Sequence, residues 1–181
     1  MKTLRQILEV TTNHYTAGKQ SIPFGLSYPK SKKYQTTRSS LGHHEIEHAH
    51  TSITPTQNQH EILAMDDDGK ARLKLTAHSD KGTPHILKIA DLAASEGNQV
   101  GAHDLYHHLI TNHGFELHGS DHSEGAKRIW HKLARNPDIR VTGIHTSGKE
   151  VTIPHGTFEM FHQHAYHPGA RIKTLVARRR K

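Results

Sequence analysis

The hydrophobic pattern of this chain changes its period near residue 96. Before that point, apolar residues alternate with polar ones in short runs, as they do in half-buried strands. After it, over residues 100–113 and again over 126–134, apolar residues recur about every 3.6 residues, which places them on one face of a helix. Because both patterns occur in one chain, the sequence predicts an α/β (α+β) fold with a mixed, largely antiparallel sheet and two main helices.

A β-hairpin is the best-defined local prediction. Residues 61–65 and 71–76 are strand-like, and the turn between them contains Gly69, which can adopt the positive φ of a tight turn. The two runs are therefore expected to pair, with Leu63 and Leu73 on neighbouring strands of one sheet.

The remaining elements follow from the same periodicities. A helix is expected over residues 101–113, with Gly114 as its C-terminal cap, and a second helix is expected from Ala126 until Asn136-Pro137 ends it. Further strands are expected over residues 44–53, 85–92, 115–117, 139–144 and 151–153. We divide the chain into an irregular N-terminal arm (1–40), one folded domain (41–155), and a histidine- and aromatic-rich segment with a basic tail (156–181).

Charge and composition limit the classes of function. The 181 residues include 24 Lys and Arg against 17 Asp and Glu, which gives a net charge of +7 and makes a polyanionic partner plausible. The basic tail is the candidate segment for contact with nucleic acid, which remains an alternative partner. No apolar run is long enough to cross a bilayer, and residues 1–10 do not have the pattern of a secretory signal, so we expect no membrane association and a cytoplasmic location. The absence of cysteine excludes disulfides and thiolate chemistry.

Several segments between about residues 45 and 145 resemble the GNAT-like N-acetyltransferase fold. The predicted hairpin and the strand after it are similar to the second, third and fourth strands of that family. The loop Glu96-Gly-Asn-Gln-Val-Gly-Ala102 resembles its phosphate-binding loop, and residues 126–133, which contain Ile129-Trp130, resemble its last characteristic helix. A His-Gly pair before a strand, a Ser-Asp pair and then a helix that contains Ile129-Trp130 also resemble the style of small proteins of tailed bacteriophages.

This resemblance implies a coenzyme A site and catalytic groups at definite positions. The backbone of Gly97, Asn98, Val100, Gly101 and Ala102 would hold the pyrophosphate at a helix N-terminus. Asp91 would be the general base, and Tyr106 or a nearby histidine would replace the leaving-group acid, because the position of the family's tyrosine is occupied by Trp130. An indole N–H cannot act as an acid near neutral pH. We therefore expect a catalytically degenerate fold that requires no cofactor, with acetyl-CoA as cofactor if the chain is active.

The 20 histidines raise a metal-site alternative. His44-Glu-Ile-Glu-His48 has the spacing of a zinc-protease motif, which requires a helix, but the alternation around it favours a strand with His44, His48 and His50 on one side. His162, His164 and His167 form a second cluster, beside aromatic residues that could dock this segment on the fold. Solvated or packed histidines explain both clusters more simply, so we assign no metal site.

The sequence thus leads to one preferred function and two alternatives. The preferred function is a phage-type accessory or virion-associated protein that uses its fold for contacts with a protein partner. Virion components are candidate partners, and the location is the cytoplasm of the host cell, with assembly into a virion as the alternative. The alternatives are an active acetyl-CoA-dependent N-acetyltransferase and a histidine-rich protein that binds metal or nucleic acid.

Overall fold

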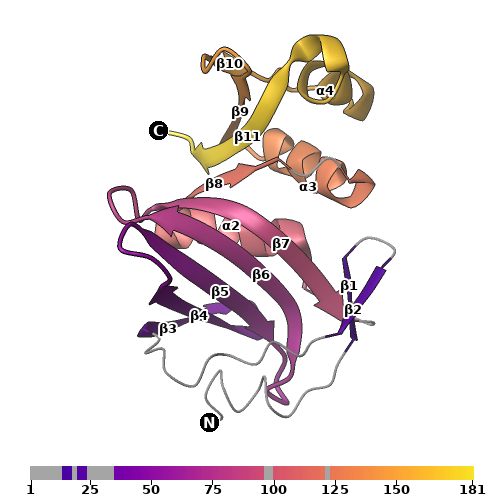
Figure 1. Ribbon diagram of the computed structural model, residues 1–181. Helices are drawn as coiled ribbons and strands as arrows, with labels where there is room; N and C mark the ends of the chain where they lie inside the picture. Colours follow the sequence, from indigo (N-terminus) through magenta and orange to yellow (C-terminus); the bar gives the residue numbers. More distant parts are fainter. Residues whose placement is uncertain (1–13, 18–19, 24–34, 96–99, 121–122) are drawn as a thin grey trace. The chain divides into compact units, whose positions relative to one another are not determined.

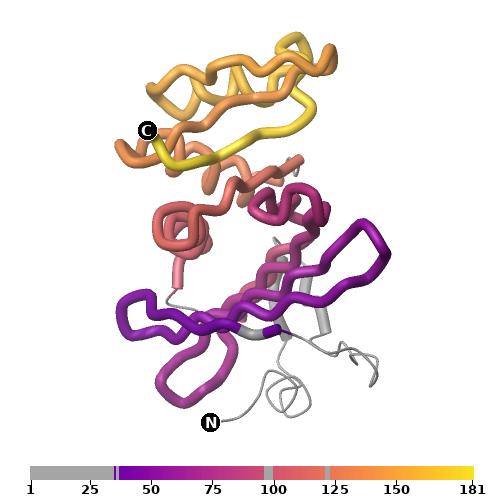
Figure 2. Tube along the Cα trace, turned by 90° about the vertical axis from the view of Figure 1, so that its left-hand side faces the viewer, coloured from indigo at the N-terminus to yellow at the C-terminus, as the bar shows by residue number. Residues whose placement is uncertain are grey.

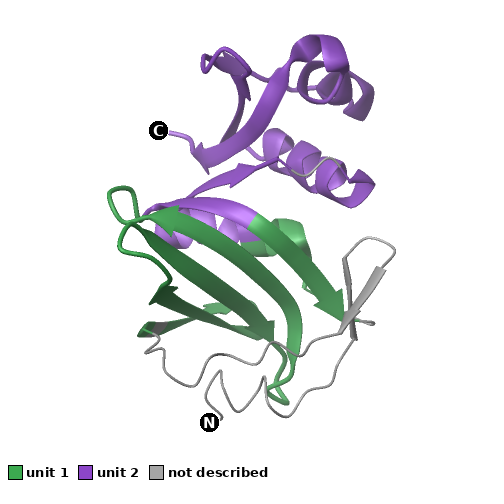
Figure 3. Ribbon diagram, in the orientation of Figure 1, with its two compact units in different colours: residues 1–84, 90–105 green, residues 85–89, 106–181 purple. Residues whose placement is uncertain are grey.

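The computed structural model describes residues 14–17, 20–23, 35–95, 100–120 and 123–181 of a mixed α+β chain whose strands are mostly antiparallel (Figure 1). The chain divides into two compact units (Figure 3). Unit 1 comprises residues 1–84 and 90–105, and unit 2 comprises residues 85–89 and 106–181. One strand, β7 (Ile86–Ser95), and one helix, α2 (Ala102–His113), have residues in both units.

Unit 1 is built from antiparallel strands. They are β1 (His14–Ala17), β2 (Gln20–Pro23), β3 (Gln35–Leu41), β4 (His44–Ser52), β5 (Gln57–Met65), β6 (Ala71–Asp80) and the second part of β7. The order is β3-β4-β5-β6-β7, and β1 pairs with both β2 and β7. Figure 2 traces the successive hairpins of β3 to β6 from indigo to magenta.

The predicted hairpin is confirmed as β5 and β6. Leu63 pairs with Lys74 and Ala64 with Leu73, so Leu63 and Leu73 lie on neighbouring strands as expected. Gly69 has φ 71°, and its N–H donates to the carbonyl of Asp66 at 2.9 Å. The Asp66 side chain also accepts from the backbone of Asp68 and Lys70, so one carboxylate organises the turn.

Unit 2 contains the second part of α2, two further helices among the described residues, and strands that pair in both parallel and antiparallel directions. Its elements after α2 are β8 (Glu116–Gly119), α3 (Glu124–Arg135), β9 (Ile139–His145), β10 (Glu150–Thr152), α4 (Phe158–Ala165), the 3-10 turn Pro168–Ala170 and β11 (Ile172–Arg179). β7 pairs parallel with β8 over Ile86–Lys88. β11 lies between β8 and β9, antiparallel to both, and β10 pairs with β9.

Both predicted helices are present. Gly114 follows α2 with φ 70°, and Ser123 caps α3 by accepting from the N–H of Ala126 at 3.2 Å. The apolar face predicted for α3 is the buried one, with Trp130, Leu133 and Ala134 inside. Helix α3 ends at Arg135, directly before Asn136-Pro137, as expected.

Three sequence expectations need correction. The arm predicted to be irregular contains β1, β2 and most of β3. Strand β3 pairs with β4 along its whole length, and Arg38 on it also forms an ion pair with Glu47 of β4 at 2.9 Å. The basic tail is β11, whose apolar centre is buried between two strands. The histidine- and aromatic-rich segment before β11 contains a further helix, α4, which Thr157 caps. Phe161 and Ala165, one turn apart on this helix, are both buried. The expected domain boundaries at residues 40 and 155 stay predictions.

Candidate functional site

The site residues that the resemblance implies fall in different surroundings. Asp91 is exposed on the part of β7 that belongs to unit 1, whereas Tyr106 is only 4% exposed and belongs to unit 2. Val100 is buried, and Gly101 and Ala102 lead into α2. Gly97 and Asn98 lie outside the described residues, so their expected role in a phosphate cradle stays a prediction.

The start of α2 carries a negative charge of its own. Asp104 stands in the first turn, and its backbone N–H donates to the carbonyl of Gly101 at 3.0 Å. A Cβ placed on Gly101 would meet the Asp104 carboxylate oxygen Oδ2, so this carboxylate lies directly beside Gly101. A first-turn carboxylate already satisfies the positive end of the helix dipole. It would also repel a pyrophosphate brought to the same helix end.

Trp130 occupies the interior of unit 2. Its side chain is 2% exposed, and a Cβ placed on Gly119 of β8 would lie 2.5 Å from its ring atom Cζ2. The ring of Tyr106 meets it edge-on with centroids 6.4 Å apart. The absence of a side chain at position 119 therefore allows the indole to come this close to the strand. Both aromatic rings are packing groups, and neither is accessible to a thioester.

His44 and His48 lie on strand β4 and not on a helix, as the alternation predicted. Four residues of extended chain separate their Cα atoms by about 13 Å. A zinc-protease motif needs one helical turn between its two histidines. The structure therefore excludes that alternative for this pentapeptide. Among the residues that the structure describes, no group of three or more histidine or acidic side chains is gathered for a metal ion.

A chain of hydrogen bonds that the sequence did not predict runs across three strands of unit 1. His48 Nε2 lies 2.8 Å from His60 Nδ1, and His60 Nε2 lies 2.8 Å from Ser79 Oγ. All three side chains are buried. Burial, together with the nearby His50 and His78, lowers the pKa of His60 to about 4.

The order of hydrogen bonds, Ser79 to His60 to His48, is that of a nucleophile, a base and a group that orients the base. However, Ser79 is 1% exposed, and a base with a pKa near 4 is weak at neutral pH. We therefore assign the chain of His48, His60 and Ser79 to the structure of the sheet. Its only sequence signal is the alternation of β4, because His60 and Ser79 are brought together by the register of β5 and β6.

The other face of the same strands carries buried ion pairs. Lys74 Nζ lies 2.9 Å from Glu61 Oε2, and both side chains are at most 5% exposed. Thr76 and Gln59 donate to the two oxygens of Glu61, so its carboxylate is satisfied. Removing one partner of such a pair leaves a buried charge and is strongly destabilising. These residues hold the sheet together and do not form an open site.

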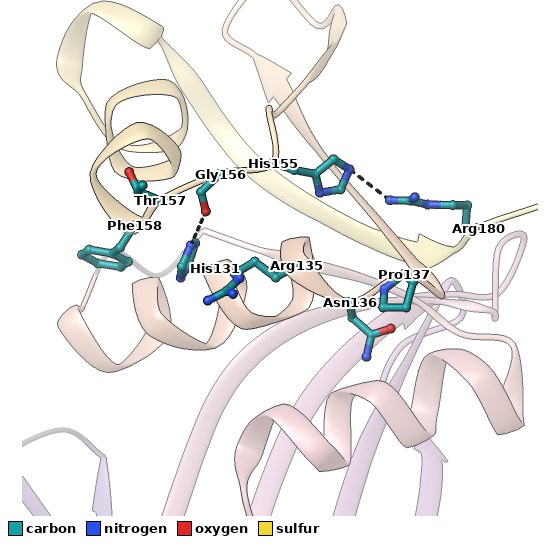
Figure 4. A pocket seen from close by; sticks show the side chains of 9 residues that line it. All are labelled: His131, Arg135, Asn136, Pro137, His155, Gly156, Thr157, Phe158 and Arg180. Carbon is teal, nitrogen blue, oxygen red and sulfur yellow. Dashed lines mark hydrogen bonds between the residues drawn. The ribbon is translucent and has the colours of Figure 1, made fainter.

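Unit 2 contains an open cleft of about 910 Å³ lined by basic side chains (Figure 4). His131 and Arg135 come from α3, Phe158 begins α4, and Arg180 directly follows β11. The remaining lining residues are Asn136, Pro137, His155, Gly156 and Thr157. No carboxylate is among the described residues that line it.

Hydrogen bonds fix the walls of this cleft. His131 Nε2 donates to the carbonyl of Gly156 at 3.1 Å, which joins α3 to the segment before α4. Arg180 donates to the carbonyl of Ile139 at 3.2 Å and to His155 Nε2 at 3.0 Å, while His155 Nδ1 donates to the carbonyl of Ala134. These bonds link α3, β9 and the end of the chain. The cleft is thus held by contacts between segments far apart in the sequence.

The second histidine cluster proves to be part of α4 and the turn after it. His162 packs its ring near Phe158 and Tyr166, with centroids 6.1 and 5.8 Å away, and His167 Nδ1 accepts from the N–H of Gly169. His164 is exposed. The aromatic Phe161 is fully buried, which agrees with the expectation that aromatic residues dock this segment.

No helix in the described part of the chain is long and apolar enough to cross a membrane. Comparisons with models of known protein families, with curated proteins and with solved structures found no match to this chain.

Proposed function

We propose that the protein is a binding protein built on an acetyltransferase-like fold that no longer carries out acetyl transfer. Its role is to contact other macromolecules. The expected setting, an accessory or virion-associated protein of a tailed bacteriophage with a protein partner, belongs to the same proposal.

The observation that carries the proposal is the packing of Trp130. The family resemblance places the leaving-group acid at this position, and here it is an indole that is 2% exposed. The indole N–H is a donor that does not release its proton near neutral pH. Tyr106, the expected substitute, is 4% exposed and packs against Trp130. Neither group is placed to protonate a thiolate leaving group at the surface of unit 2.

The first turn of α2 supports the same proposal independently. Asp104 places a carboxylate beside Gly101, where the resemblance puts a pyrophosphate. Two negative groups at one helix end repel each other, and the Asp104 carboxylate already interacts with the positive end of the helix dipole. Low or absent affinity for coenzyme A is the expected consequence.

One topological observation favours acetyl transfer as the second candidate. From β4 to β9, the described elements follow in the order strand, hairpin, strand, helix, strand, helix, strand, which is the order that the resemblance implies. β7 and β8 are also parallel and are connected through α2. Ligands of open α/β sheets often bind at the carboxyl ends of such strands. A fold of this order could hold a cofactor if Asp104 moved away.

Native mass spectrometry of the full chain with added coenzyme A tests the proposal. We expect the natural protein to be detected only without bound coenzyme A. The Asp104→Asn variant is measured beside it, because this change removes the opposing charge while keeping a hydrogen-bonding side chain in the first turn. A stoichiometric complex of the natural protein with coenzyme A would contradict the proposal. Binding by Asp104→Asn alone would support it, because the lost affinity would then be traced to Asp104.

A further inference from the structure

We propose that the cleft of unit 2 binds a segment of single-stranded nucleic acid, with Arg135 and Arg180 on the phosphates and Phe158 against a base. The inference goes beyond the proposed function, because no residue of this cleft enters the argument about acetyl transfer. It rests on the charge of the cleft, on the basic face of α3 that leads into it, and on the aromatic ring at its wall.

The charge of the cleft has one sign. Arg135 and Arg180 are exposed, and the described lining residues include no carboxylate. Arg180 is oriented by its hydrogen bonds to the carbonyl of Ile139 and to His155, which hold its guanidinium at the cleft wall. Guanidinium groups bind phosphate oxygens through paired N–H donors. The lining is therefore suited to an anion.

The basic character continues along α3. Arg128, His131, Lys132 and Arg135 are spaced at i, i+3, i+4 and i+7, so they share one face of the helix. Arg128 and Arg135 are about 10 Å apart along the helix axis. Among the described residues, no carboxylate forms an ion pair with Lys132 or Arg135, whereas Lys127 on the flank pairs with Glu124. A row of cations over this length matches a chain of phosphates better than one small anion.

The end of β11 adds to this row. Arg179, Arg180 and Lys181 are exposed, whereas Arg178 is engaged by Glu116 and Glu150. Arg180, which lines the cleft, and its neighbours Arg179 and Lys181 form no ion pair with a described carboxylate, whereas Arg178 does. This arrangement extends the positive surface beyond the cleft itself.

An aromatic ring distinguishes nucleic acid from an acidic peptide as the occupant. Phe158 is half-buried at the cleft wall, and the ring of His131 meets it edge-on with centroids 5.3 Å apart. Bases of single strands stack on such rings, and this adds affinity that does not depend on sequence. An acidic peptide would use the cations but gain nothing specific from the ring.

Two carboxylates lie close to the cleft but are not among the residues that line it. Glu159 is in the first turn of α4, where its own backbone N–H and the Thr157 hydroxyl hold the pKa of its carboxyl below the ordinary value, with a smaller effect from His131. Asp138 is 68% exposed and lies 3.9 Å from His107. The N-terminus of α4 is thus capped by its own residues, and the proposal makes no use of it.

Fluorescence anisotropy of a labelled oligothymidylate with the full chain tests the proposal. We expect Arg135→Ala to weaken binding about five- to tenfold and to reduce the salt slope of the binding constant by about 0.7, the value for one lost phosphate contact on a single strand. Lys149→Ala is the matched control, because Lys149 is also exposed but lies at the other end of β9. Absence of binding, or an equal loss in both variants, would overturn the proposal.

A second pair of measurements isolates the ring. Phe158→Leu keeps an apolar side chain at the cleft wall. We expect it to weaken oligothymidylate binding at least fivefold and to leave the inhibition constant of inorganic polyphosphate unchanged. Polyglutamate that competed as well as unlabelled oligothymidylate would overturn the assignment to nucleic acid. These results do not depend on coenzyme A, so the failure of this inference would leave the proposed function standing.

Discussion

Trp130 is the single residue on which both the stability of unit 2 and the proposed loss of catalysis depend. It fills the space between α3 and β8 and meets Tyr106 edge-on. We expect Trp130→Ala to lower the free energy of unfolding by about 3–5 kcal/mol, because it removes a large buried ring. Urea denaturation followed by circular dichroism measures this change. A nearly unchanged midpoint would mean that the ring is exposed and does not pack in unit 2.

His60 gives the protein a defined dependence on pH. Burial first, and then His50 and His78, lower its pKa from 6.5 to about 4 in the folded state. Between these pH values the unfolded chain binds a proton that the folded chain does not. The free energy of unfolding therefore rises with pH over this range, and the penalty from His60 is absent above pH 6.5. The contribution of this residue is at most about 3 kcal/mol.

The measurement is the free energy of unfolding at several pH values for the natural protein and for His60→Gln. We expect the variant to lose part of the slope between pH 4 and 6.5. Burial also lowers the pKa of His108 and His113, so some slope will remain in the variant. Identical slopes in both proteins would show that His60 is not held neutral by the fold.

At the scale of elements, the contact between α3 and β8 depends on a glycine. We expect Gly119→Ala to destabilise the protein by about 1–3 kcal/mol, because the added methyl would overlap the ring of Trp130 at 2.5 Å. Gly125→Ala on the first turn of α3 is the matched control, since nothing lies within 4 Å of a Cβ there. Thermal denaturation compares the two variants. Equal melting temperatures would contradict the close packing of α3 on this strand.

Elements with one clear period could be predicted from the sequence, and elements with mixed signals could not. The hairpin of β5 and β6 has alternation on both sides of a glycine turn, and α3 has a cap and a stop signal. β11 contains the buried run Leu175-Val176-Ala177, but the basic residues on both sides of that run indicated a solvated tail. α4 is an eight-residue helix in which histidines interrupt the apolar spacing.

At the scale of the whole molecule, the candidate sites show why function was harder to predict than the fold. The cleft of unit 2 joins residues near positions 131, 156 and 180, and no local motif links them. The basic spacing along α3 was visible, but only the fold shows that it leads to a cleft. The sequence shows an acidic residue at position 104. Only the structure shows that its carboxylate lies beside Gly101, where it opposes the binding of an anion.

The central claim, a fold of this order that does not use acetyl-CoA, is tested most directly by the melting temperature of the full chain with and without acetyl-CoA. A ligand present at 100 times its dissociation constant would raise stability by about 2.7 kcal/mol. Gly101→Glu serves as the control, because it fills the place beside Asp104 and adds a second negative charge there. We predict no shift in either protein. A clear rise for the natural protein that disappears in Gly101→Glu would contradict the claim.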